Sequence, residues 1–63
     1  MFNVGDVLYT KAGNYTEVVK VDMEQEYPLI CEITLHGETI LDSWTLEGVH
    51  MKGKKSILDL EIE

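Results

Sequence analysis

The side chains that bind metals best in proteins are scarce in this chain. Cys31 is its single cysteine, and His36 and His50 are its only histidines. A structural zinc site needs four ligands, usually paired at close spacing, and the sequence contains no CxxC or HxxxH pair. We therefore expect no metal site. His36, next to Gly37, is typical of a solvated turn, and Cys31 lies among apolar residues and is expected in the core.

Nucleophilic catalysis would need a serine, a threonine or the cysteine beside a base and an orienting acid. Asp42 and Ser43 are adjacent, so on a strand their side chains would point to opposite faces. The sequence has no GxSxG, and pairing Asp42 with Glu47 as two catalytic carboxylates would rest only on the number of acids. The "KGKK" stretch lacks the strand-to-helix context of a phosphate loop. We expect no enzyme activity, no catalytic residue and no cofactor.

The charge of the chain is strongly one-sided. Twelve acidic residues face five lysines, arginine is absent, and the formal net charge is −7. Between Asp22 and Glu47 there is no lysine or arginine at all. Such a surface repels phosphate backbones, so direct nucleic-acid binding is disfavoured. Two interpretations remain open: the acids keep the protein in solution, or they form a surface that meets a basic partner.

Short strands are the elements that the sequence predicts. No window keeps apolar residues at helical spacing, whereas segments rich in Val, Ile, Leu and Thr recur between Gly-, Asn- or Pro-containing breaks. The five predicted strands are residues 6–10, 16–23, 29–36, 38–46 and 57–62. They predict an all-β domain over residues 1–63, a small five-stranded antiparallel SH3-like barrel with an OB-type barrel as the alternative.

Alternation predicts which side chains face the core. The inward sets are Leu29, Cys31, Ile33 and Leu35 in the third strand and Leu58, Leu60 and Ile62 in the fifth. In the second strand, Val19, Val21 and Met23 share one face. In the fourth strand, Ile40, Trp44 and Leu46 share a face with Asp42, so neither face is cleanly apolar. "HGE" predicts a compact hairpin turn centred on Gly37.

The pieces "GDV", "VVKVD", "YPL" and "WTLEG" occur in an order that resembles a group of small phage and prophage proteins. The matching positions are Gly5, Asp6, Val7, Val18, Val21, Asp22, Tyr27, Pro28, Leu29, Trp44, Thr45, Glu47 and Gly48. The resemblance implies an SH3-like barrel encoded by a virus or mobile element, and it transfers no catalytic residue. Many such proteins have a glycine before the second strand, where this chain has Tyr15 and Thr16.

No segment has the features of a secretion signal, and no apolar run approaches the roughly 20 residues of a membrane span. We therefore expect no membrane association and a cytoplasmic location, in the host cell if the chain is phage-encoded.

The leading functional hypothesis is a small acidic module that binds a host protein with a basic surface and modulates or inhibits it, for example by charge mimicry. Tyr27 or Trp44 would supply the apolar anchor, although the core is the favoured place for Trp44. The predicted acidic face comprises Glu24, Glu26, Glu38, Asp42 and Glu47.

Two other hypotheses remain open. One is a homo-oligomer that sequesters an anionic, nucleotide-like ligand at subunit junctions through Lys52, Lys54 and Lys55. The other is a virion accessory protein.

Overall fold

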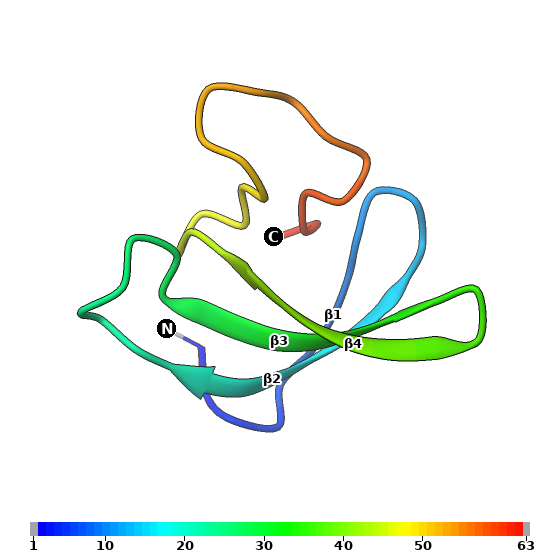
Figure 1. Cartoon of the computed structure of the whole chain (residues 1–63), viewed down its shortest axis with the longest axis horizontal. Coiled ribbons are helices and arrows are strands. Elements are labelled where there is room, and N and C mark those ends of the chain that lie inside the picture. The colour runs from blue at the N-terminus through cyan, green and yellow to red at the C-terminus, as the bar shows by residue number, and fades with distance from the viewer. Residues whose placement is uncertain (1, 63) are drawn as a thin grey trace.

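The computed structural model describes residues 2–62 as an all-β protein (Figure 1). Its four strands are β1 (Val7–Tyr9), β2 (Tyr15–Val21), β3 (Leu29–Leu35) and β4 (Glu38–Trp44). They form one antiparallel sheet in the order β1-β2-β3-β4, so each strand pairs with its neighbour in sequence. The first four of the five predicted strands are confirmed, with boundaries shifted by at most two residues.

The β3–β4 turn is the tightest connection, and its residues explain it. Leu35 pairs with Glu38, which leaves only His36 and Gly37 in the loop. Both have positive φ, 51° and 79°. Two consecutive residues of positive φ define the hairpin turn whose twist matches that of the strands it joins. The predicted hairpin at "HGE" is therefore confirmed.

The core lies on one side of the sheet, called here the inner face. Val18, Leu29, Cys31, Ile33 and Trp44 are fully buried there. The alternation predicted for β3 is confirmed, because Glu32 is exposed between two buried neighbours. Leu35, at the end of the strand, is half-buried and packs against the core.

A β-bulge changes the face that β2 presents. Its pairing with β3 shifts between Val18 and Lys20, so Val19 is an extra residue in the ladder. An extra residue reverses the alternation beyond it. Val18 and Val21 therefore both pack inward, whereas Met23 is exposed. The prediction that Val19, Val21 and Met23 share one face does not hold across the bulge, and of the three only Val21 packs against the core.

The predicted fourth strand also ends early, and its first four residues are exposed. β4 stops at Trp44, two residues before its predicted end, and Leu46 lies in the loop that follows. Trp44 is in the core, but Ile40 is substantially exposed although it pairs with the buried Ile33. Along β4, the inner face is thus well covered only near Trp44.

The segment 57–62 is not the fifth strand that alternation predicts. It turns and makes one isolated bridge, between Thr10 and Leu60. The amide of Lys11 donates to the carbonyl of Asp59 (2.9 Å), which ties this segment to the end of β1. Leu60 is buried, as expected, but Ile62 is exposed. Residues 2–62 therefore form a four-stranded open sheet, and a fifth strand that closes a barrel is not among them.

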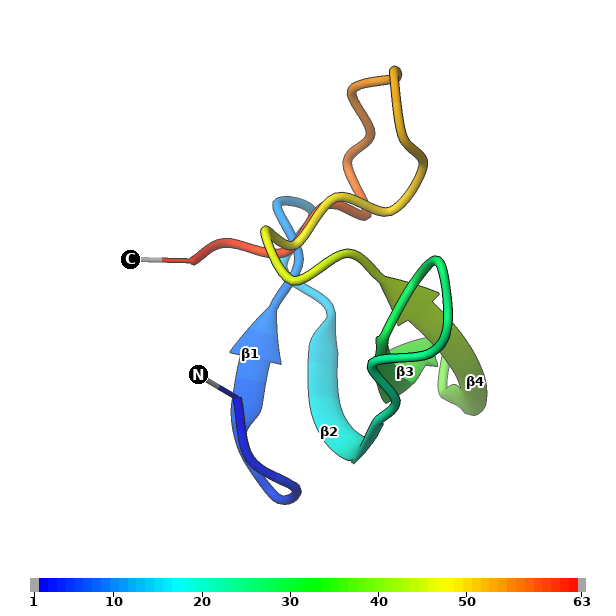
Figure 2. The ribbon, with the colours of Figure 1, turned by 90° about the vertical axis from the view of Figure 1, so that its left-hand side faces the viewer.

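Gly48 fixes how the C-terminal segment packs. The amide of Leu60 donates to the carbonyl of Gly48 (2.8 Å). A Cβ at Gly48 would lie 2.6 Å from Cδ1 of Ile62, and its φ is +83°. The backbone conformation favours glycine here, and a larger residue would also displace the Ile62 side chain. Figure 2 shows the result, with the chain after β4 folded above the sheet.

Candidate functional site

The side of the sheet opposite the core carries a patch of apolar, aromatic and acidic side chains that are exposed, except for the half-buried Glu17. We call it the outer face, and it comprises Val7, Tyr9, Tyr15, Glu17, Glu32 and Leu41. Strand register builds it: Val7 pairs with Glu17, Glu17 with Glu32, and Glu32 with Leu41. One row of side chains therefore crosses all four strands.

Two tyrosines lie beside this row on the β1–β2 hairpin, two residues further toward the turn. Tyr9 and Tyr15 are directly paired, and their rings make an edge-to-face contact with centroids 6.0 Å apart. They are 52% and 41% exposed. The Tyr15 hydroxyl donates to Glu17 Oε1 (3.2 Å), and this hydrogen bond is the main reason that the pKa of Tyr15 is raised. Exposed tyrosines are typical anchors of protein interfaces.

The outer face holds two glutamates in an unfavourable arrangement. Glu17 and Glu32 are directly opposite on neighbouring strands, where Cβ atoms lie about 5 Å apart and like charges repel. Among residues 2–62, the ion pairs are Lys20–Asp22 and His50–Asp42, so neither glutamate has a cationic partner. A cation supplied from outside the chain would relieve this repulsion.

The outer face borders a groove beside β1. The groove has a volume of about 970 Å³ and runs between β1 and the C-terminal segment. Val7 and Tyr9 line it together with Phe2, Leu60 and other residues of both segments. The apolar part of the outer face thus continues around the edge of the sheet.

The acidic residues predicted to form one surface are divided between two ends of the molecule. Glu26 and Glu47 line a hollow of about 180 Å³ next to the β2–β3 turn, which also carries Glu24. Glu38 follows the hairpin turn at the other end of β3. A seven-residue strand is about 20 Å long, so these acids do not form a continuous patch. Asp42 is already paired with His50.

The two predicted apolar anchors serve the fold. Trp44 is fully buried, and its indole N–H donates to the carbonyl of Leu58 (2.8 Å), so of the two roles considered for it the core role is confirmed. Tyr27 is half-buried, and its hydroxyl accepts a hydrogen bond from the amide of Lys52 (3.1 Å). The Lys52 ammonium lies 5.6 Å from the centre of the Tyr27 ring, a cation–π contact.

The lysine loop is an exposed turn. Met51 and Lys54 form an isolated bridge on either side of Lys52 and Gly53. All three lysines of the loop are exposed: Lys52, Lys54 and Lys55. The contact between Lys52 and Tyr27 attaches the loop to the end of the β2–β3 connection.

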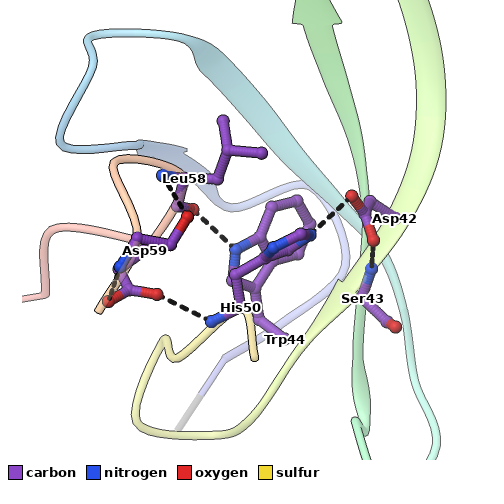
Figure 3. Close-up of polar contacts among 7 residues, drawn as sticks. Asp42, Ser43, Trp44, His50, Leu58 and Asp59 are labelled. Atoms are coloured by element: carbon purple, nitrogen blue, oxygen red, sulfur yellow. Dashed lines mark hydrogen bonds and ion pairs between the residues drawn. The ribbon is translucent and has the colours of Figure 1, made fainter. Parts of the chain in front are cut away.

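Sequence reasoning missed a polar network that joins the C-terminal loop to β4 (Figure 3). His50 Nε2 lies 2.7 Å from Asp42 Oδ2, and the rings of His50 and Trp44 are 5.4 Å apart. Asp59 accepts hydrogen bonds from the backbone amides of His50 (2.9 Å) and Ser56 (3.3 Å). Eight residues separate Asp42 from His50, and no local pattern predicts that the loop returns to the strand.

The contacts of this network hold the C-terminal loop against β4. An Asp–His pair could orient a base, but Figure 3 shows the Ser43 side chain pointing away from His50, as alternation on a strand requires. The backbone amide of Ser43 donates to Asp42 Oδ1 (2.8 Å). The amide of His50 lowers the pKa of Asp59, with smaller help from Ser56 and Lys11 against the opposing effect of burial.

Cys31 is buried in the core, as expected. Burial, with a smaller contribution from the charge of Asp42, raises its pKa to about 11. The thiol therefore stays protonated at neutral pH and is a poor nucleophile. Within residues 2–62, no three His, Cys, Asp or Glu side chains are arranged to hold a metal ion.

None of the described residues 2–62 belongs to a helix with the length and apolar character that a membrane crossing requires. Comparisons of the chain with protein-family models, curated proteins and solved structures find no match.

Proposed function

We propose that this protein is a binding module that uses its outer face to hold a protein partner with a basic surface. The observation that carries the proposal is the pair of cross-strand glutamates, Glu17 and Glu32, beside exposed Tyr9, Tyr15 and Leu41. Apolar and aromatic area supplies the contact that holds a partner, while charge without an internal counterion favours a partner of opposite sign.

Each part of the outer face would act on a different stage of binding. The glutamates and the net charge of −7 would attract a basic surface over distance and speed association. On contact, a lysine or arginine of the partner would lie between Glu17 and Glu32 and relieve their repulsion. Tyr9 and Tyr15, already held edge-to-face, would lose little conformational entropy on binding and would slow dissociation.

We further infer that the chain is of the phage and prophage type, with an SH3-like barrel as its parent fold. The sequence pieces "GDV", "VVKVD", "YPL" and "WTLEG" and the bridge between Thr10 and Leu60, which brings the C-terminal segment to β1, support this inference. Inhibition of a host factor that normally binds nucleic acid, in the bacterial cytoplasm, is the most specific form of the proposal.

Affinity capture from a bacterial lysate tests the proposal. The baits are the wild-type protein, the outer-face variant Glu17→Gln/Glu32→Gln, and the matched control Glu24→Gln/Glu26→Gln, which loses the same two charges in the β2–β3 turn. A specific partner should be retained by the wild type and the control and depleted on the outer-face variant. Mass spectrometry identifies it.

Binding kinetics at two ionic strengths then assign the roles. The outer-face variant should associate about tenfold more slowly and with a flatter salt dependence. Tyr9→Ala and Tyr15→Ala should instead speed dissociation, by about tenfold or more if either is an anchor. Equal loss of binding in the turn control would mean that only net charge matters, and the outer face would be rejected as the site.

A further inference from the structure

β4 is an outer strand of the sheet, and one of its edges is open. Every residue of β4 pairs with β3 without irregularity, and no other strand of residues 2–62 pairs with its far side. Figure 2 shows β4 at the end of the row of strands, with the C-terminal loop above the sheet and not beside it. An open edge presents unpaired backbone groups to any strand that can add to it.

The hairpin turn determines which backbone groups point outward. In a hairpin with a two-residue loop, the closing pair, here Leu35 and Glu38, is hydrogen-bonded. The amide and carbonyl groups of every second residue from Glu38 therefore point toward β3. Those of Thr39, Leu41 and Ser43 point to the open edge. The amide of Ser43 already donates to Asp42 Oδ1 (2.8 Å), so the part from Thr39 to Leu41 is the most available.

Of the devices that usually prevent strand addition, this edge has only charged side chains, Glu38 at its first residue and Asp42, which is held by His50. Outer strands are commonly protected by lysine, proline or a bulge. β4, with the sequence ETILDSW, contains no lysine and no proline, and its ladder with β3 has no register shift. Instead it exposes two branched apolar side chains at its centre, Ile40 (44% exposed) and Leu41 (65% exposed).

We propose that β4 pairs antiparallel with β4 of a second copy of this chain, around a two-fold axis at Leu41, to give a continuous eight-stranded sheet. In this register all seven residues overlap. Leu41 is opposite Leu41 of the second copy, Ile40 is opposite Asp42, Thr39 is opposite Ser43, and the remaining residues pair Glu38 with Trp44. The same surface serves both copies, as a two-fold interface requires.

Charge selects this register over its neighbours. Only registers that differ by two residues keep the outward backbone groups facing each other. A shift in one direction places Glu38 opposite Asp42 of the second copy. A shift in the other direction places the two Asp42 side chains opposite each other. Directly opposed like charges are destabilising, so the register centred on Leu41 is the one that overlaps fully and opposes no two acids.

Self-association has a salt dependence that separates it from binding of a basic partner. Two chains of charge −7 carry −14 together, so they repel each other before contact. Added salt screens this repulsion and should strengthen the dimer. The same salt should weaken a complex between the outer face and a basic protein. The two proposals share Leu41 but otherwise use different contacts, and their opposite salt responses distinguish them.

Sedimentation equilibrium over a wide concentration range, at low and high salt, tests the dimer. The wild type should show a monomer–dimer equilibrium that shifts toward dimer with added salt. Leu41→Lys places two ammonium groups at the axis and should weaken the dimer by about tenfold or more. Ile57→Lys makes the same kind of change on an exposed loop side chain and should leave the equilibrium unchanged within about twofold.

Two further measurements fix the register. Cysteine in place of Leu41 should form an intermolecular disulfide under mild oxidation, because the two positions meet on the axis within bonding reach. Cysteine in place of Thr39 should not, because its partner is Ser43. A protein that stays monomeric at all concentrations and salt conditions would overturn the proposal. The proposal would also be overturned if Leu41→Lys left the dimerisation constant unchanged, or if Thr39→Cys formed the intermolecular disulfide in place of Leu41→Cys.

Discussion

Ile33→Ala tests the described packing most directly. Ile33 is fully buried in β3, between Thr16 of β2 and Ile40 of β4. Truncation of a buried isoleucine to alanine costs about 2–5 kcal/mol, because apolar contacts are lost and the cavity closes only in part. A 63-residue domain at about 0.05–0.15 kcal/mol per residue has about 3–9 kcal/mol of total stability. The substitution should therefore remove about a fifth of it or more, since the lowest cost is about 2 kcal/mol and the highest total is about 9 kcal/mol.

The same reasoning gives the expected shift in melting temperature. The entropy of unfolding, about 2.1 cal/mol/K per residue, amounts to about 0.13 kcal/mol/K for 63 residues. A loss of 2 kcal/mol, the lower limit, then lowers Tm by about 15 °C. Thermal and urea unfolding followed by circular dichroism measure it. Ile57→Ala, at a side chain that is 71% exposed, is the matched control and should change Tm by no more than about 4 °C. Equal shifts for the two variants would refute the described register of β3.

Three further predictions concern pH and nucleic acid. The amide of His50 lowers the folded-state pKa of Asp59, so Asp59 contributes to the free energy of unfolding above its unfolded pKa, and this contribution is lost as pH falls through the folded pKa. Asp59→Asn should therefore make stability less dependent on pH at acid pH. An unchanged pH dependence would contradict this prediction. The pKa of Cys31 is raised from 9.0 to about 11, so its contribution is present below pH 9.0 and is lost as pH rises toward about 11. Cys31→Ala should remove that alkaline loss, whereas rapid reaction of the native thiol with a thiol reagent at neutral pH would show that Cys31 is not buried. With a net charge of −7, the protein should not shift duplex DNA or single-stranded RNA in a gel at physiological salt, and binding that weakens steeply with salt would refute the charge argument.

Local patterns were sufficient to predict the centre of the sheet. The alternation from Leu29 to Leu35 and the His36–Gly37 turn depend on neighbouring residues alone, and both were correct. In β2 the same reasoning failed because the bulge at Val19 reversed the alternation of side chains. The residue types around Val19 do not predict a bulge.

Longer-range effects account for the other differences. Residues 57–62 have the apolar alternation of a strand, but Asp59 accepts amides from both His50 and Ser56 and so stabilises a turn. The outer face required the register of four strands at once. A count of acids along the sequence indicated turn residues such as Glu24 and Glu26, whereas pairing brings Glu17 to Glu32 across strands.

The order of the strands in the sheet has a consequence for how the chain folds. Because each strand pairs with its neighbour in sequence, the sheet can form by closing short loops in succession. The bridge between Thr10 and Leu60 instead spans 50 residues along the chain (60 minus 10), and each doubling of loop length adds about 0.6 kcal/mol of closure entropy. We therefore expect the sheet contacts to dominate the transition state and the docking of the last segment to follow it. Substitutions at Asp59 or Leu60 should then accelerate unfolding and leave the rate of folding nearly unchanged.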